Sequence, residues 1–195
     1  AITAAFGCAP LIYRAGRYGL GPNTADMLKR AGIRIDTSVR SLFDYSPQGG
    51  PDYSNHPLAP YWVDRESRLL ELPVSSTYWG VLRQLGPMIH RVQRHLPMFF
   101  SGFSRFRLLE RIALTPEGVS SDEALRGIDV LLDSALPVLV LSLHSPTLAP
   151  GHTPYAKSEA DVENLYAWLK AVYSHLAARG VSSCTVAEII AATGE

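Results

Sequence analysis

The segment that most constrains the fold lies near the start of the chain, where two short apolar runs flank a helical pattern. Pro10–Arg14 is apolar and β-prone, and a glycine-rich turn, Gly16–Gly21, follows it. Pro22–Ala31 predicts a helix, because proline is favoured at a helix start and Gly32 occupies the favoured position after its end. Ile33–Asp36 is a second candidate strand. A strand, a helix and a strand in this order predict a parallel sheet.

The rest of the 195-residue chain continues to alternate between candidate strands and helices. Ser120 with Glu123, and Ser158 with Asp161, have the spacing of helix-capping pairs. The other expected elements are a strand at Leu69–Val74, helices at Trp79–His95 and Phe103–Ile112, and a strand buried on both faces at Val138–Leu143. Since no repeat and no linker interrupts this order, we expect residues 1–195 to form a single α/β domain.

The charge balance and the cysteine content exclude several classes of protein. Eighteen basic residues balance eighteen acidic ones, and no basic run suggests a nucleic-acid partner. No apolar run reaches the length of a membrane-spanning helix. Two cysteines are too few for a disulfide framework, so we expect Cys8 and Cys184 to be small buried residues. The oligomeric state stays open, as does the choice between cytoplasm and cell envelope.

Three apolar runs end directly in a polar residue with catalytic potential, namely Arg14, Asp36 and His144. Because the ends of parallel strands lie on one face of a domain, we expect these residues on the same rim. The carboxylate could hydrogen-bond the imidazole and keep it protonated as a general acid. The arginine could orient a carboxylate or stabilise developing negative charge. Each residue taken alone could equally form a structural ion pair.

Other patterns of catalysis or ligand binding are missing from the sequence. It has no Gly-x-Ser-x-Gly segment, which argues against a serine esterase. The turn Gly16–Gly21 has neither the glycine order of a dinucleotide site nor a following Walker lysine. His90 and His95 would point to different sides of a helix, and no spacing of histidines predicts a three-ligand zinc site.

Three segments resemble motifs of the polysaccharide deacetylases, the NodB-type family that is similar to carbohydrate esterase family 4. Tyr13–Gly19 (YRAGRYG) resembles the third motif, Ile35–Val39 the fourth, and Leu141–Ser145 (LSLHS) the fifth, which contains the catalytic histidine. They occur in the order of the family and span most of the chain. Segments such as Glu71–Val74 are similar to a WalW-like branch associated with cell-envelope polysaccharides.

This resemblance implies a fold, a reaction and roles for individual residues. The fold would be part of a (β/α) barrel, and the reaction would be metal-dependent removal of acetyl groups from a polysaccharide. A divalent ion, usually zinc, would polarise the acetyl carbonyl and activate water in the full-length protein. Arg14 would hold the catalytic base, His144 would protonate the leaving group, and Asp36 would tune His144. The backbone around Arg17 and Tyr18 would help to bind the oxyanion.

The family's first two motifs, an aspartate pair and His-x-x-x-His, normally precede the third. Only about a dozen residues precede it here. We therefore expect this chain to be the C-terminal portion of such a barrel, without its first strands or a complete metal site, and inactive by itself.

Two alternative functions stay open at this point. One is a non-catalytic carbohydrate-binding or assembly module, in which the aromatic loop Tyr45–Tyr61 and Trp62 would stack on sugar rings. The other is an unrelated glycosidase or transferase that uses Asp36 together with a second carboxylate such as Glu71.

Overall fold

A computed structural model describes residues 2–66, 68–93 and 108–194, apart from the side chain of residue 93. The chain divides into two compact units. The first unit comprises residues 1–74 and 183–195, and the second comprises residues 75–182. The structure is α/β, with helices and two small sheets, and no closed barrel forms among the described residues. The single domain expected from the sequence stays a prediction.

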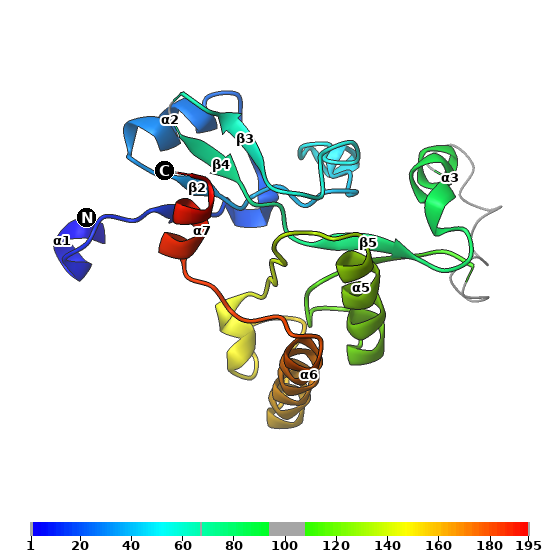
Figure 1. Ribbon diagram of the computed structural model, residues 1–195. Coiled ribbons are helices and arrows are strands. Elements are labelled where there is room, and N and C mark those ends of the chain that lie inside the picture. The colour runs from blue at the N-terminus through cyan, green and yellow to red at the C-terminus, as the bar shows by residue number, and fades with distance from the viewer. Residues whose placement is uncertain (1, 67, 94–107, 195) are drawn as a thin grey trace. The chain divides into compact units, whose positions relative to one another are not determined.

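The first unit contains a four-stranded sheet with the order β1-β2-β4-β3 (Figure 1). Strands β1, β2 and β4 are parallel, as the sequence predicts, and β3 is antiparallel to β4. The elements of this unit are α1 (Ile2–Phe6), β1 (Ile12–Tyr13), a 3-10 helix (Gly16–Tyr18), α2 (Thr24–Arg30), β2 (Ile35–Asp36), a second 3-10 helix (Ser46–Gln48), β3 (Tyr61–Asp64), β4 (Leu69–Glu71) and α7 (Val186–Ala192).

Helix α2 packs against this sheet through a small apolar core (Figure 1). Leu28 on the helix contacts Ile33 and Leu69, and all three are buried. The helix ends where the sequence predicts, with Gly32 in the left-handed conformation at φ 74°. This conformation favours glycine because a Cβ atom would clash there. Strands β2 and β4 are buried along their whole length. They end at Asp36 and Glu71, so both carboxyl groups lie at the same end of the sheet.

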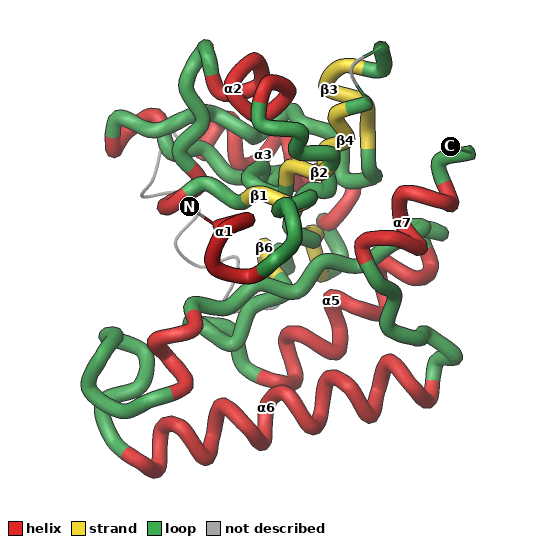
Figure 2. Tube along the Cα trace, turned by 90° about the vertical axis from the view of Figure 1, so that its left-hand side faces the viewer, coloured by secondary structure: helices red, strands yellow, loops and turns green. Residues whose placement is uncertain are grey.

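The second unit is built from an antiparallel pair of strands and two long helices. Helix α5 packs against β5, and α6 runs alongside α5 (Figure 2). Ile128, Trp168 and Val172 belong to the core between them. The elements of this unit are β5 (Ser76–Trp79), a 3-10 helix (Arg83–Leu85), α3 (Gly86–Gln93), β6 (Glu110–Ala113), α5 (Ser121–Asp133), another 3-10 helix (Ser145–Leu148) and α6 (Glu159–Ala178).

Both predicted capping pairs are confirmed. The hydroxyl of Ser120 accepts a hydrogen bond from the Glu123 amide, and the Glu123 carboxylate accepts one from the Ser120 amide. Ser158 and Asp161 make the same reciprocal pair at the start of α6. Such pairs satisfy amides that a helix leaves unbonded in its first turn.

Two predicted helices are partly wrong. The helix expected at Trp79–His95 is replaced at its start by β5, which ends at Trp79, and α3 begins only at Gly86. Of the helix expected at Phe103–Ile112, the part from residue 110 belongs to strand β6, which pairs with β5. Pairing between distant segments overrode the local helical pattern in both cases. Residues 94–107, including His95, lie outside the described part of the chain.

The strand predicted at Val138–Leu143 is also absent as a regular element, and most of its residues are only half-buried. The backbone of this segment bonds to two separate partners, since Ser75 N donates to Val140 O and Ser142 N donates to Leu114 O. These single bonds do not build a continuous ladder with one neighbouring strand.

The expectation for the cysteines is wrong, because Cys8 and Cys184 are both free and exposed. Both lie in short segments beside terminal helices rather than in a core. In the described part of the chain, none of the helices combines the length and the apolar character needed to cross a membrane.

Candidate functional site

Arg14 and Asp36 lie at the same end of two neighbouring parallel strands. Tyr13 in β1 pairs with Asp36 in β2, so Arg14 is the first residue beyond β1. The Arg14 Nε donates a hydrogen bond of 3.1 Å to the carbonyl of Thr37, directly after β2. Burial lowers the pKa of the Arg14 guanidinium, and among the charges that oppose this are those of Glu71 and Asp36. The structure thus brings together two of the three predicted rim residues.

Asp36 is buried and bonded locally. Its Oδ1 accepts a hydrogen bond of 3.0 Å from the Ser38 amide and another from the Ser38 hydroxyl. The same hydroxyl accepts the Ala15 amide at 2.8 Å, so that it ties the ends of β1 and β2 together. Burial raises the pKa of the Asp36 carboxyl, whereas the bonds from Ser38 act in the opposite direction.

Glu71 completes a buried polar cluster at the ends of β1, β2 and β4. It is the last residue of β4, and only 1% of its surface is exposed. Its Oε1 accepts the Val39 amide at 2.9 Å. Burial and the neighbouring charge of Asp36 raise the pKa of Glu71 to about 8. The strand predicted at Leu69–Val74 places Glu71 in its interior, whereas β4 ends at Glu71 and so puts this residue on the rim. The two apolar residues directly before Glu71 are the signal in the sequence that could have placed it there.

The turn after Arg14 has an unusual backbone conformation. Arg17 and Tyr18 both have positive φ angles, 53° and 56°. This region is unfavourable for residues with a Cβ atom and often occurs at functional sites. The Tyr53 hydroxyl donates a hydrogen bond of 2.6 Å to the Tyr18 carbonyl and so stabilises the turn. The Tyr18 amide donates a hydrogen bond of 3.3 Å to the Ala15 carbonyl. One of the two residues predicted to bind the oxyanion therefore uses its amide within the turn.

The aromatic side chains of the loop after β2 contact one another. The rings of Tyr18 and Tyr45 stack at 5.6 Å, and Tyr45 meets the edge of Tyr53, which is buried. The Arg40 guanidinium lies over the Phe43 ring, 4.1 Å from its centroid. Much of the aromatic surface that the sequence offers for stacking on sugars is therefore used in contacts within the loop and with Tyr18 of the turn after β1.

His144 belongs to the second unit, where its partner is Glu117. The Nδ1 of His144 lies 2.6 Å from the Glu117 Oε2, and the His144 amide donates to Oε1 at 2.9 Å. The Thr147 hydroxyl donates to the same Oε1 at 2.8 Å. The Glu117 side chain is 7% exposed and that of His144 is 56% exposed. Because Nδ1 faces the carboxylate, the ring is oriented and its Nε2 is the nitrogen left for other partners.

Sequence reasoning missed Glu117, although a signal for it exists. The residue follows the apolar run Ile112–Leu114 by a few positions, as the other candidates follow theirs. Arg14, Asp36, Arg17 and Tyr18 all lie in the first unit, whereas His144 lies in the second. Within the second unit, Glu117 has the position relative to His144 that the sequence analysis had given to Asp36.

The described residues do not fit a zinc site. No group of three or more His, Cys, Asp and Glu side chains among them could hold a metal ion. Zinc in proteins normally takes at least three such ligands. No catalytic step through a metal is therefore derived from these residues.

Comparisons of the chain with protein-family models, with curated proteins and with solved structures find no match.

Proposed function

We propose that this chain contributes the arginine, aspartate and histidine part of the active site of a polysaccharide deacetylase, within a partial (β/α) barrel. The reaction would remove an acetyl group from a sugar of an envelope polysaccharide. The observation that supports this most is the order of three motifs along the chain, two of which end neighbouring parallel strands. Arg14 and Asp36 are joined there through Thr37 and Ser38.

His144 is the proposed general acid. Its Nε2 would donate a proton to the sugar nitrogen or oxygen as the bond from that atom to the acetyl carbon breaks. Glu117 supports this role because it orients the ring through Nδ1 and is itself held by the Thr147 hydroxyl. In this proposal Glu117, and not Asp36, positions the His144 ring. Asp36 instead orders the strand ends next to Arg14 through its bonds from Ser38.

Arg14 and the turn after it would act on the other reacting groups. A half-buried guanidinium is suited to orient a carboxylate base, because its donors are fixed in one plane. The turn with left-handed backbone at Arg17 and Tyr18 would face developing negative charge, and its contribution would come from Arg17, because the Tyr18 amide bonds to the Ala15 carbonyl. The metal and the base of the family reaction would require ligands beyond the described residues, and the zinc dependence of the complete protein is part of this proposal.

The carbohydrate-binding alternative has weaker support from the aromatic loop, because Tyr45 and Tyr53 contact each other and Tyr53 is buried. The glycosidase alternative needs two accessible carboxylates. Asp36 and Glu71 are 4% and 1% exposed and bind backbone amides, which favours a structural use for both.

The acid role of His144 can be tested with two substrates that differ in their leaving group. The protein would be expressed from its complete reading frame and given an N-acetylglucosamine oligomer or 4-nitrophenyl acetate. His144→Ala should slow deacetylation of the sugar about 100-fold to 10,000-fold, since the leaving amine must be protonated. Hydrolysis of 4-nitrophenyl acetate should change much less, because nitrophenolate leaves without a proton.

The matched control for this experiment is His152→Ala. His152 is an exposed histidine in the following loop and should leave both rates unchanged. An equal loss on both substrates would refute the acid role of His144, and so would an unchanged rate on the sugar.

A further inference from the structure

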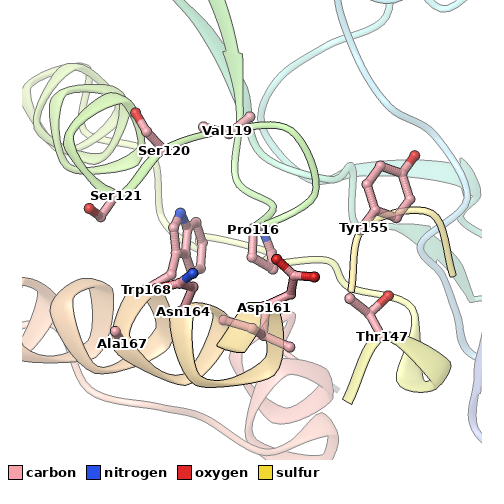
Figure 3. Close-up of a pocket in the computed structure, with 11 residues that line it drawn as sticks. Pro116, Val119, Ser120, Ser121, Thr147, Tyr155, Asp161, Asn164, Ala167 and Trp168 are labelled. Carbon is pink, nitrogen blue, oxygen red and sulfur yellow. The ribbon is translucent and has the colours of Figure 1, made fainter. Parts of the chain in front are cut away.

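The second unit contains a pocket of about 410 Å³ that none of the motifs discussed above accounts for. It lies between the start of α5, the first turns of α6 and the segment from Thr147 to Tyr155 (Figure 3). Its volume is within the range of small-molecule sites, which runs from roughly 300 to 1,000 Å³. The His144 imidazole does not line it, but Thr147 does.

Trp168 gives the pocket a buried hydrogen-bond donor that lacks a partner. The residue is 6% exposed, and most of its ring packs in the core against Ile128 and Val172. No described group accepts a hydrogen bond from its Nε1. In Figure 3 the nitrogen lies at the end of the ring that is on the side of Ser120 and Ser121, at the start of α5. A buried N–H without an acceptor is costly. The nitrogen itself has almost no accessible surface, so a ligand oxygen would gain this bond once the pocket wall beside the ring moves slightly.

The other polar groups of the wall both donate and accept. Asp161 uses its Oδ2 for the amides of Lys157 and Ser158, and its other oxygen takes part in none of these cap bonds. Asn164, one turn further along α6, adds an exposed amide that can donate and accept. The cap bonds from Ser158 hold the pKa of Asp161 below its ordinary value, which keeps it a charged acceptor.

The charge and the apolar surface of the pocket wall indicate which class of ligand it can bind. Among the described residues, no lysine, arginine or histidine lines the pocket, and the Asp161 carboxylate disfavours an anion. Pro116, Val119 and Leu165 supply apolar patches between the polar groups. A ligand with hydroxyl groups at its edge and C–H groups on its faces matches this combination, and it would carry no charge.

We propose that this pocket binds a neutral sugar ring, with the Trp168 Nε1 donating to a ring or hydroxyl oxygen and Asp161 and Asn164 bonding its hydroxyls. Thr147 lines the same pocket and donates to Glu117, which holds His144. An occupied pocket would therefore fix the segment on which His144 is positioned. Such a pocket would be a second site of contact with the polysaccharide, in addition to the proposed deacetylase site. The inference rests on the proposed function only for the identity of the polymer that supplies the sugar.

The test measures binding and does not depend on catalysis. The N-acetylglucosamine trimer would be titrated into ¹⁵N-labelled protein while the three indole N–H signals are followed. The signal of Trp168, identified by its loss in Trp168→Phe, should shift with saturation, and those of Trp62 and Trp79 should not. Asn164→Ala should weaken binding about fivefold to tenfold, as expected for one lost hydrogen bond. Glu163→Ala, an exposed neighbour outside the pocket, is the matched control.

Several results would overturn the inference. One is an indole signal that does not shift up to the solubility limit of the trimer. Another is equal affinity in Asn164→Ala and the control, and a third is equal or tighter binding of glucuronate at the same signal. The Asn164→Ala comparison does not require Trp168→Phe to fold. Acetate release without binding at Trp168 would refute this inference alone, whereas binding without acetate release would refute the proposed function alone.

Discussion

Glu71→Gln should change how the stability of the first unit depends on pH. Glu71 is almost fully buried beside Asp36, and this environment raises its pKa from 4.5 to about 8. An uncharged glutamine of nearly the same shape could still accept the Val39 amide through its carbonyl oxygen. The substitution therefore removes the titrating proton and leaves the local packing in place.

The sign of the effect follows from the direction of the pKa shift. A carboxyl whose folded pKa is raised contributes stability that is complete below its unfolded pKa and is lost as the pH rises through the folded pKa. For Glu71 this window runs from about 4.5 to about 8. At about 1.4 kcal/mol per pH unit, the upper limit of the loss is about 5 kcal/mol, and relaxation around the buried charge will reduce it. Glu71→Gln should match the wild type near pH 4.5 and exceed it in stability at pH 8.

Urea unfolding at several pH values between 5 and 8, followed by circular dichroism, measures this difference directly. The free energy of unfolding of the wild type should fall with pH more steeply than that of Glu71→Gln. Glu66→Gln, an exposed glutamate of the same unit, should keep the wild-type slope. Parallel curves for the wild type and Glu71→Gln would contradict this prediction, because Glu71 would then titrate in the folded protein as it does in the unfolded chain.

Two further substitutions test the packing of the two units. Tyr53→Phe removes the hydrogen bond to the Tyr18 carbonyl, so it should lower the free energy of unfolding by about 1 kcal/mol, and faster hydrogen exchange at Tyr18 would locate the loss in the turn. Gly127→Ala would place a Cβ atom 2.9 Å from the Cγ2 of Ile112 in the buried contact between α5 and β6. Overpacking lowers the free energy of unfolding by about 1–3 kcal/mol, and the higher helix propensity of alanine raises it by about 1 kcal/mol. Thermal unfolding of Gly127→Ala should therefore show a lower melting temperature than the wild type, and a higher one would contradict this prediction.

The sequence predicts those parts of the fold that depend on local signals. The start of the first unit is one example, because Gly32 ends α2 and the short strands on either side are apolar. The two capping pairs are another, since each helix start is encoded within four residues. In both cases the structure agrees with the prediction.

The sequence is less informative wherever distant segments decide the structure. Trp79 is the first residue of the predicted helix Trp79–His95, yet it pairs with Glu110 across β5 and β6. Glu117 and His144 are 27 residues apart, and only the folded loops bring them together. Periodicity cannot report such contacts. The Arg14–Asp36 rim could be predicted because Arg14 directly follows β1, Asp36 ends β2, and these two strands pair in parallel.

Acetate release from an N-acetylglucosamine oligomer, with and without a metal chelator, measures the proposed deacetylase activity directly, with the protein expressed from its complete reading frame. We expect a product with fewer acetyl groups, formed only without the chelator and lost in His144→Ala. An intact oligomer under all conditions would contradict the proposed deacetylase function, and acetate release that persists in His144→Ala would contradict the role given to this chain.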